Sequence, residues 1–300
     1  MSNAPSEIRY RDRQTGELRT ERVFGERELR WFYGNGRVGR WLAERVFARP
    51  AFNHLYGLFQ RSRFSRRAIP AFVERLGVDV AEAERPVAEY SSLDAFFARR
   101  LRPGVRPLDP DPDALLSPAD GRALAFEAVG DEGLRVKRSR VGLEELLGDA
   151  ELARRYWGGG ALVVRLAPVD YHRFHFPADG VASPSRRLGK VLHSVHPLAL
   201  AGGAPSFRNK REVALLESER FGALALVEVG AMIVGSIEQT YRPGPVRRGE
   251  EKGCFHLGGS TVVVLTEPGR VHFDEDLLAA SREELESYVR MGSRVGVGGG

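Results

Sequence analysis

One serine in this sequence stands where it could cut its own backbone. Ser260 follows Gly258 and Gly259 and opens the apolar run Thr261–Leu265. Two glycines permit a tight turn and a Val-Val-Val-Leu run predicts a buried strand, but neither explains a hydroxyl at the joint. No G-x-S-x-G turn surrounds Ser260, so it is poorly placed for an external acyl substrate. It is well placed to attack the carbonyl carbon of Gly259.

An aspartate lies in a second turn-like motif. Residues 117–121 read Ser-Pro-Ala-Asp-Gly and precede a predicted strand, which places the carboxylate of Asp120 on a turn. An aspartate in such a turn commonly hydrogen-bonds its own backbone, so this motif alone favours a structural role. If a histidine base lies nearby in the fold, the same carboxylate could orient it.

Two histidines three residues apart form a third motif. His172 and His175 lie among aromatic residues directly after an apolar stretch. Their imidazoles could act as general acids and bases or bind a metal ion. No cluster of Cys, His or Glu elsewhere supplies obvious further ligands, although His193 and His196 are possible partners, so we assign no metal. A serine, a histidine and an aspartate are together the parts of a nucleophilic relay.

A mainly β body is expected to position these motifs. Short apolar stretches between Gly and Pro residues, typical of strands, are Arg122–Ala128, Ala161–Ala167, Ala223–Val229, Met232–Ile237 and Thr261–Leu265. Helical patterns lie mostly before them, and one late helix is expected within Asp274–Val289. The order indicates an α+β fold whose catalytic body resembles a β barrel or sandwich, with amphipathic helices at the N-terminus.

Two of the early helices have recognisable ends. The stretch Ile69–Leu76 is followed by Gly77, a residue that commonly ends a helix. Ser92 precedes a second helical stretch that has an aspartate in its first turn, so its hydroxyl is expected to cap that helix. These ends predict two short helices before the first strand.

The N-terminal region combines arginines with aromatic and apolar residues. Residues 1–70 contain fifteen arginines, no lysine and seven acidic residues, a charge of +8, whereas the whole chain carries +5. From Leu29 onward the pattern predicts two or three short amphipathic helices, broken at residues 34–36 and at Pro50. Such helices could lie in an anionic membrane interface, or could pack on the catalytic body with their arginines in solvent. No nucleic-acid-binding module surrounds the arginines, so nucleic acid is not an expected partner.

Cysteine content and hydropathy bear on the compartment. The single cysteine, Cys254, excludes an intrachain disulfide and fits a reducing environment. No stretch approaches the roughly 20 apolar residues that span a bilayer. The first thirty residues also lack the apolar region of a signal peptide. We therefore expect the chain to remain on the cytoplasmic side. If the N-terminal helices lie in a membrane interface, it is a peripheral protein at the cytoplasmic face of the cell membrane.

Four motifs occur along the chain in a specific order. They are residues 117–121 (Ser-Pro-Ala-Asp-Gly), 171–175 (Tyr-His-Arg-Phe-His), 229–237 (Val-Gly-Ala-Met-Ile-Val-Gly-Ser-Ile) and 249–255 (Gly-Glu-Glu-Lys-Gly-Cys-Phe), the last followed by Gly259-Ser260-Thr261. Together they resemble the phosphatidylserine decarboxylase proenzymes, which make a pyruvoyl group by self-cleavage. The resemblance runs from about residue 90 to residue 292, and more loosely through the N-terminal helices.

The resemblance implies that the chain cuts itself between Gly259 and Ser260. In that family pattern His175 is the base that takes the Ser260 proton, and Asp120 orients His175. The products are a large chain, residues 1–259, and a small chain, residues 260–300, which begins with a pyruvoyl group made from Ser260. This covalent cofactor would decarboxylate phosphatidylserine to phosphatidylethanolamine, and His172 would return the proton to the substrate carbon.

The same resemblance divides the chain and names its partners. Residues 1–70 would associate with an anionic membrane surface that carries the substrate, and residues 71–300 would form the catalytic domain. The two cleaved chains would stay together, and the sequence leaves homo-oligomerisation open. The sequence departs from the family pattern at residues 193–197 (His-Ser-Val-His-Pro), where the family usually has Tyr and Asn in place of the two histidines. The second departure is the extra glycine, Gly258.

Two other functions remain open on the sequence. One is a pyruvoyl-dependent decarboxylase for a soluble amino acid, against which the basic, aromatic N-terminal region argues. The other is a non-catalytic lipid-binding module, against which the complete set of Asp120, His175 and Ser260 argues.

Overall fold

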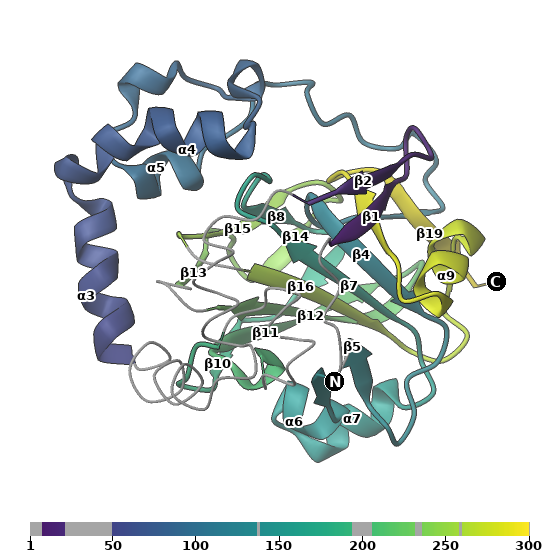
Figure 1. Ribbon diagram of the computed structural model, residues 1–300. Helices are drawn as coiled ribbons and strands as arrows, with labels where there is room; N and C mark the ends of the chain where they lie inside the picture. Colours follow the sequence, from purple (N-terminus) through teal and green to yellow (C-terminus); the bar gives the residue numbers. More distant parts are fainter. Residues whose placement is uncertain are drawn as a thin grey trace, which may run out of the picture.

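The fold is known from a computed structural model, which describes residues 8–21, 50–136, 139–193, 206–231, 236–257 and 260–299 (Figure 1). The helices expected between residues 29 and 49 lie outside these ranges. So do His196, Gly258, Gly259 and most of the strand expected at residues 232–237.

Eleven strands of the described part form one sheet, in which only β1 and β18 pair in parallel. Ten of them follow the spatial order β14 (Gly244–Val246), β9 (Gly180–Ala182), β11 (Arg211–Ser218), β12 (Gly222–Gly230), β16 (Ser260–Thr266), β7 (Ala161–Leu166), β4 (Gly121–Phe126), β18 (Glu286–Val289), β1 (Arg9–Asp12) and β2 (Leu18–Thr20). The eleventh, β10 (Arg186–Leu188), pairs with β11. Strand β16, which begins at Ser260, therefore lies in the middle of the sheet.

Smaller sheets flank this one. One has the order β13 (Ile237–Gln239), β15 (Glu251–Phe255) and β8 (Arg173–His175), and another the order β17 (Val271–Phe273), β19 (Arg294–Gly298) and β3 (Ala114–Leu116). A two-stranded ribbon joins β5 (Leu134–Val136) to β6 (Ser139–Val141). Strand β8 carries His175 and β15 leads toward Ser260, so the β13–β15–β8 sheet adjoins the segments that carry the candidate catalytic residues.

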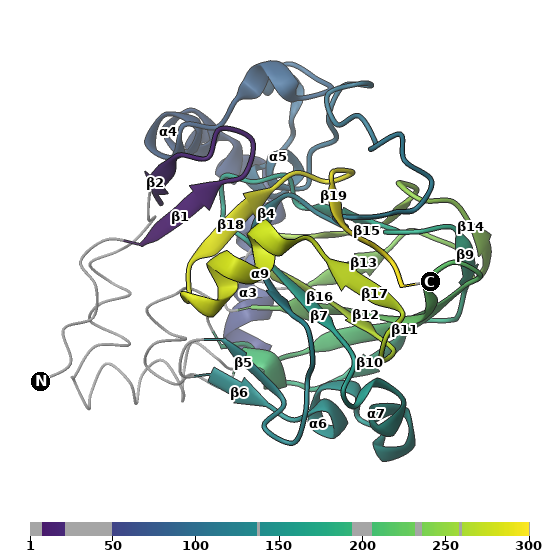
Figure 2. The ribbon, with the colours of Figure 1, turned by 90° about the vertical axis from the view of Figure 1, so that its right-hand side faces the viewer.

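The helices lie at the margins of the sheets. They are α3 (Pro50–Arg61), α4 (Ile69–Leu76), α5 (Leu93–Phe97), α6 (Leu143–Leu147), α7 (Ala150–Tyr156) and α9 (Glu275–Arg282), with 3₁₀ turns at Arg63–Ala68, Val80–Glu82, Val87–Glu89 and Ser206–Arg208. Helices α3 to α5 form an arc on one side of the molecule, and α6 and α7 lie at another edge (Figures 1 and 2). None of the helices that the structure describes is long and apolar enough to cross a membrane.

The apolar run after Ser260 is buried on both faces of the main sheet. Val262 and Val264 belong to the core on one face, whereas Val263 and Leu265 belong to the core on the other. Successive side chains of a strand point to opposite faces, so an unbroken apolar run suits a strand that is covered on both sides. Burial of this strand fixes the position of Ser260 at its start.

The sequence-based expectations are partly met. Helices and sheets are both present, and β4, β7, β12 and β16 match predicted strands to within two residues. Helix α4 ends at Gly77 in the left-handed conformation (φ 70°), and the Ser92 hydroxyl accepts a hydrogen bond from Ala95 N, as expected. The described sheets follow open strand orders, so the finer expectation of a barrel or sandwich is not confirmed.

The late helix expected within Asp274–Val289 is present as α9, in the first half of that range. Helix α9 ends at Arg282, and the chain turns at Glu284, which has a positive φ of 56°. Residues Glu286–Val289 then form β18, which pairs with β4 and with β1. These partners lie far away in the sequence, so local pattern could not reveal the strand.

Buried charges join the end of the N-terminal hairpin β1–β2 to other strands of the main sheet. Arg165 of β7 donates to Glu21 and to Glu286, with a nitrogen–oxygen distance of 2.6 Å to each. Arg122 of β4 lies 3.4 Å from the same Glu21 and also pairs with Asp170. All five side chains are almost completely buried. Each buried charge therefore depends on its partners.

Replacing Arg165 with methionine should destabilise the fold strongly. The change leaves Glu286 buried without its arginine, and we expect the free energy of unfolding to fall by ~3–5 kcal/mol, measured by urea denaturation. Arg155→Met is the matched control, because Arg155 pairs with Glu217 and Glu267 near the surface, where such pairs contribute about 1 kcal/mol or less. Equal losses in the two variants would contradict the importance of the buried network.

Candidate active site

Ser260 is held at the first position of a central strand. Its backbone is paired with Gly230 of β12 on one side and with Leu166 of β7 on the other. Its side chain is completely buried. The hydroxyl therefore lies at the end of a central strand, where the chain enters the core. Its surroundings are set by the neighbouring strands and turns.

His172 contacts the Ser260 hydroxyl directly. The distance from Ser260 Oγ to His172 Nδ1 is 3.0 Å, and His172 Nε2 lies 3.0 Å from the carbonyl oxygen of Ala167. A carbonyl oxygen only accepts, so Nε2 carries the proton and donates it to Ala167. Nδ1 of the neutral ring then presents a lone pair, which accepts the hydrogen bond from Ser260.

Burial keeps this imidazole neutral. His172 has no exposed surface, and its ring stacks on Phe97 of α5 with 3.7 Å between ring centroids. Burial, together with the positive charges of Arg99 and Arg122, lowers the pKa of His172 well below its usual value. A neutral imidazole aimed at a hydroxyl can take up a proton from it.

The turn that carries His172 is shaped by charged side chains. Asp170 Oδ2 accepts a hydrogen bond of 2.6 Å from Ala167 N and also pairs with Arg122. Arg99 donates to the carbonyl oxygens of Val169 and Asp170, at 3.1 and 3.2 Å. These contacts fix the backbone of residues 167–170, and with it the Ala167 carbonyl that orients the ring of His172.

His175 lies on β8, beside the turn that contains Asp120. The backbone N–H of His175 donates to Pro118 O at 2.8 Å. Its side-chain Nδ1 is buried and has no partner among the residues that the structure describes. The pKa of His175 is lowered to about 4, and burial of the ring is the largest cause. The ring is therefore a neutral, incompletely hydrogen-bonded group at pH 7.

Asp120 is bound to an arginine and a backbone amide. Its buried carboxylate accepts from Arg106 Nη2 at 2.6 Å and from Met291 N at 2.8 Å. Arg106 also pairs with Glu82 at 2.8 Å. Both carboxylate oxygens of Asp120 are thus engaged, and they hold the turn at residues 117–121 against the segment that begins at Arg290.

The structure brings together only part of the expected relay. His172 and Ser260 are hydrogen-bonded, whereas no hydrogen bond joins the described side chain of His175 to Asp120 or to Ser260. Asp120 instead reaches His175 through the backbone of its turn. The predicted cleavage site includes Gly259, which lies outside the described residues. The roles of Asp120, His175 and His172 stay predictions.

The sequence analysis missed three residues of the site. Phe97 stacks on His172, Arg99 holds the turn before it, and Arg106 binds Asp120. Phe97 ends α5, and Arg99 and Arg106 lie between α5 and β3, with no motif of their own. Only the tertiary fold places these residues within reach of their partners.

The metal alternative receives no support at His172. One ring nitrogen faces the Ser260 hydroxyl and the other faces a carbonyl oxygen, so neither is free to coordinate an ion in this arrangement. His196, one of the two further ligands considered, lies outside the described residues.

A buried serine whose hydroxyl is hydrogen-bonded to a neutral histidine is the arrangement of an enzyme in which serine is a nucleophile. A family model described as phosphatidylserine decarboxylase matches residues 93–297. The chain therefore belongs to the phosphatidylserine decarboxylase family and is an enzyme of the decarboxylase class, which confirms the resemblance seen in the motifs.

Full-length relatives agree with this assignment. Phosphatidylserine decarboxylase proenzymes of Chlamydia trachomatis serovar L2 and of Desulfitobacterium hafniense strain DCB-2 are each 41% identical to the chain, over 296 and 293 residues. The first alignment covers 98% of each protein, and the second covers 97% of this chain and 98% of the relative. The proenzyme of Chlamydia muridarum is 42% identical over 293 residues and 97% of each chain. The similarity thus extends over nearly the whole chain.

Proposed function

We propose that this chain is the precursor of an enzyme that converts phosphatidylserine to phosphatidylethanolamine with a pyruvoyl group made from Ser260. The observation that carries the proposal is the buried hydrogen bond between Ser260 Oγ and His172 Nδ1, at the start of a core strand. The proenzyme relatives support both the substrate and a self-processing step.

The cleavage begins with the Ser260 hydroxyl. A histidine takes its proton while Oγ attacks the Gly259 carbonyl carbon, and the peptide bond is replaced by an ester. A base then removes the Ser260 α-proton, and the ester carboxylate leaves as the C-terminus of residues 1–259. The dehydroalanine that remains takes up water and releases ammonia, which leaves a pyruvoyl group at the start of residues 260–300.

The residues around Ser260 fit such a group. After cleavage, residue 260 would still begin β16. Because β16 is paired with β12 and β7, the new chain end would stay anchored in the core. The pyruvoyl group supplies a carbonyl that reacts with the substrate amine and accepts the electrons released with CO₂.

The two histidines would divide the proton transfers. His172 is held by the Ala167 carbonyl and by Phe97, so its ring would remain beside residue 260 after the cut, where it can return a proton to the substrate. His175 is the base that the family pattern predicts for the cleavage. Because no hydrogen bond joins it to Ser260, this role requires a movement of one of the two side chains.

Asp120 would act on His175 indirectly. Its carboxylate is occupied by Arg106 and Met291 N, and its turn accepts a hydrogen bond from the backbone of His175. We therefore assign Asp120 as a positioning residue for the strand that carries His175.

We also propose peripheral binding to the cytoplasmic face of the membrane, with residues 1–70 as the membrane-associating region and residues 71–300 as the catalytic domain. Helix α3 and the turn after it expose large apolar side chains: Leu55, Leu58, Phe59 and Phe64. Arg61, Arg63, Arg66 and Arg67 are exposed in the same segment. Apolar side chains that enter the lipid boundary, with arginines facing anionic headgroups, would bring the site to its substrate.

Turnover of lipid vesicles tests the substrate and the membrane contact together. The purified chain should release CO₂ from phosphatidylserine vesicles and form phosphatidylethanolamine, detected by mass spectrometry of extracted lipid, and should release none from free serine. Phe64→Glu should raise the apparent KM for vesicles several-fold without affecting turnover of a soluble, short-chain phosphatidylserine, because the side chain of Phe64 is 74% exposed.

Val181→Glu is the matched control, since Val181 is also exposed but lies on β9, far from α3 (Figure 2). It should behave as the wild type on both substrates. Turnover of free serine would instead support a decarboxylase for soluble amino acids. Vesicle binding without turnover would support a non-catalytic lipid-binding module.

A further inference from the structure

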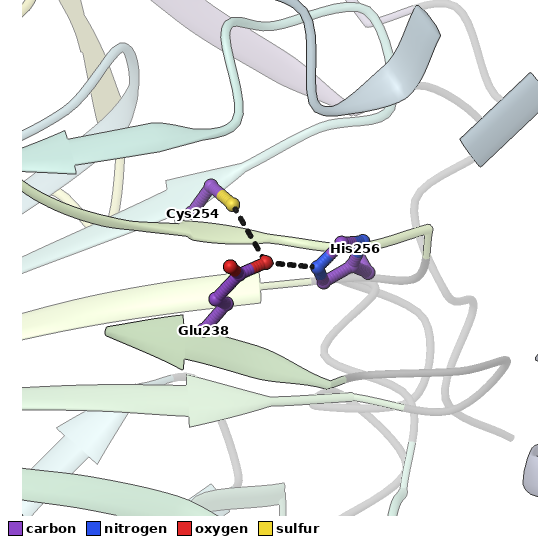
Figure 3. A group of neighbouring side chains, drawn as sticks. All are labelled: Glu238, Cys254 and His256. Carbon is purple, nitrogen blue, oxygen red and sulfur yellow. Dashed lines mark hydrogen bonds and ion pairs between the residues drawn. The ribbon is translucent and has the colours of Figure 1, made fainter. Parts of the chain in front are cut away.

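Three side chains with metal-binding groups lie on one face of the paired strands β13 and β15, and none of them takes part in the Ser260–His172 contact. Glu238 of β13 is directly opposite Cys254 of β15, and His256 follows Cys254 by two residues (Figure 3). His256 N donates to Ser236 O at 3.0 Å, which continues the pairing of the two strands past the end of β15. Residues two apart on a strand share a face, so the three side chains converge.

Their donor atoms are close enough for one ion. Glu238 Oε2 lies 2.8 Å from His256 Nε2 and 3.9 Å from Cys254 Sγ, and all three donor atoms lie within 4.8 Å of one another. Zinc bound tetrahedrally at its usual ligand distances separates its ligand atoms by roughly 3.5 Å. The side chain of Glu238 is 57% exposed, so it can make the small adjustment needed.

A buried carboxylate orients the histidine. His256 Nδ1 lies 2.8 Å from Oδ2 of Asp94 in α5, which turns Nε2 toward Glu238 and Cys254. The other oxygen of Asp94 accepts from Leu257 N at 2.9 Å, and Arg61 Nε lies 3.4 Å from Oδ2. A histidine that ligates a metal commonly donates its second ring N–H to a carboxylate in this way.

We propose that Glu238, Cys254 and His256 bind one Zn²⁺ ion, with a water molecule as the fourth ligand. The combination of one thiolate, one imidazole and one carboxylate suits zinc rather than magnesium or calcium, which prefer oxygen ligands. Exposure of Glu238 leaves the site open to solvent and to the entry of the ion. The ion would tie β13 to the chain just after β15, four residues before Ser260.

No local motif marks this cluster, because Glu238 is 16 residues away from Cys254 in the sequence. Without an ion, His256 bridges Asp94 and Glu238 by hydrogen bonds, and burial raises the pKa of the Cys254 thiol to about 11. Zinc would displace the thiol proton and take the place of the Glu238–His256 contact.

Titration of the untagged, chelator-treated full chain with Co²⁺ tests the site. Since Cys254 is the only cysteine, a thiolate-to-cobalt absorption band in the near ultraviolet reports on this residue alone. We expect the band to saturate at one equivalent of Co²⁺ and to disappear when Zn²⁺ is added. Zinc should also raise the melting temperature of the wild type.

Variants separate a built site from chance binding to a thiol. Glu238→Gln and His256→Gln should each weaken Co²⁺ binding by at least ~10-fold, and Asp94→Asn by ~10–100-fold through the orientation of His256. His272→Gln is the matched control, because His272 is exposed on β17 and should bind Co²⁺ like the wild type. Absence of the band, or equal affinity in Glu238→Gln and the wild type, would overturn the proposal.

Discussion

Ser260→Ala is expected to leave the chain in one piece and without decarboxylase activity. Alanine keeps the size and burial of the residue but has no oxygen to attack Gly259, and no pyruvoyl group can form. Intact-mass measurement should give a single species near the full 33.2 kDa. The wild type should instead give two species, residues 1–259 and residues 260–300, with the second blocked at its N-terminus.

Ser287→Ala is the appropriate control for Ser260→Ala. Ser287 is a buried serine on β18 of the same sheet, so its loss removes a buried hydroxyl at a distance from His172. This variant should be cut and should turn over phosphatidylserine like the wild type. Full activity in an uncut wild-type chain would refute the whole mechanism, because the cofactor would then have another origin.

His172→Ala and His175→Ala should separate cleavage from decarboxylation. We expect His175→Ala to remain uncut, because the base for the Ser260 proton is lost. We expect His172→Ala to be cut but to turn over phosphatidylserine ~10²–10⁴-fold more slowly, the usual contribution of a general acid or base. Intact mass reports on the first step, and CO₂ release by the cut fraction reports on the second.

The contact geometry makes this pair of variants a strict test. His172, not His175, is hydrogen-bonded to Ser260, at 3.0 Å, and presents its lone pair to the hydroxyl. If His172→Ala remains uncut while His175→Ala is cut, the first proton transfer belongs to His172. Phe176→Leu, next to the motif in the main apolar core, is the control for disturbed packing and should leave both steps in place.

Local pattern was a good guide wherever the physical cause was local. The valine run after Ser260 predicted β16, since an apolar β-branched run suits a strand that is covered on both faces. Gly77 and Ser92 marked a helix end and a helix start, because a left-handed residue and a capping hydroxyl satisfy backbone groups within a few residues. Where the partners are distant, the pattern gave no sign of the element, as for β18, which pairs with β1 and β4.

Residue types and spacing identify the groups that can do chemistry: a serine after two glycines, two histidines three residues apart, and an aspartate on a turn. They also identify the family, because four motifs in order outweigh any one of them. Neither conclusion needed a distance between side chains. Both follow from the residue types and their order along the chain alone.

Which of these groups meet depends on the three-dimensional fold. His172 and Ser260 are 88 residues apart, and their contact depends on the pairing of β16 with β7 and on the turn that Asp170 and Arg99 hold. His172 and His175 are only three residues apart, yet only the imidazole of His172 contacts the Ser260 hydroxyl. Strand register and turn geometry set that choice, and both arise from contacts between residues that are far apart in the chain.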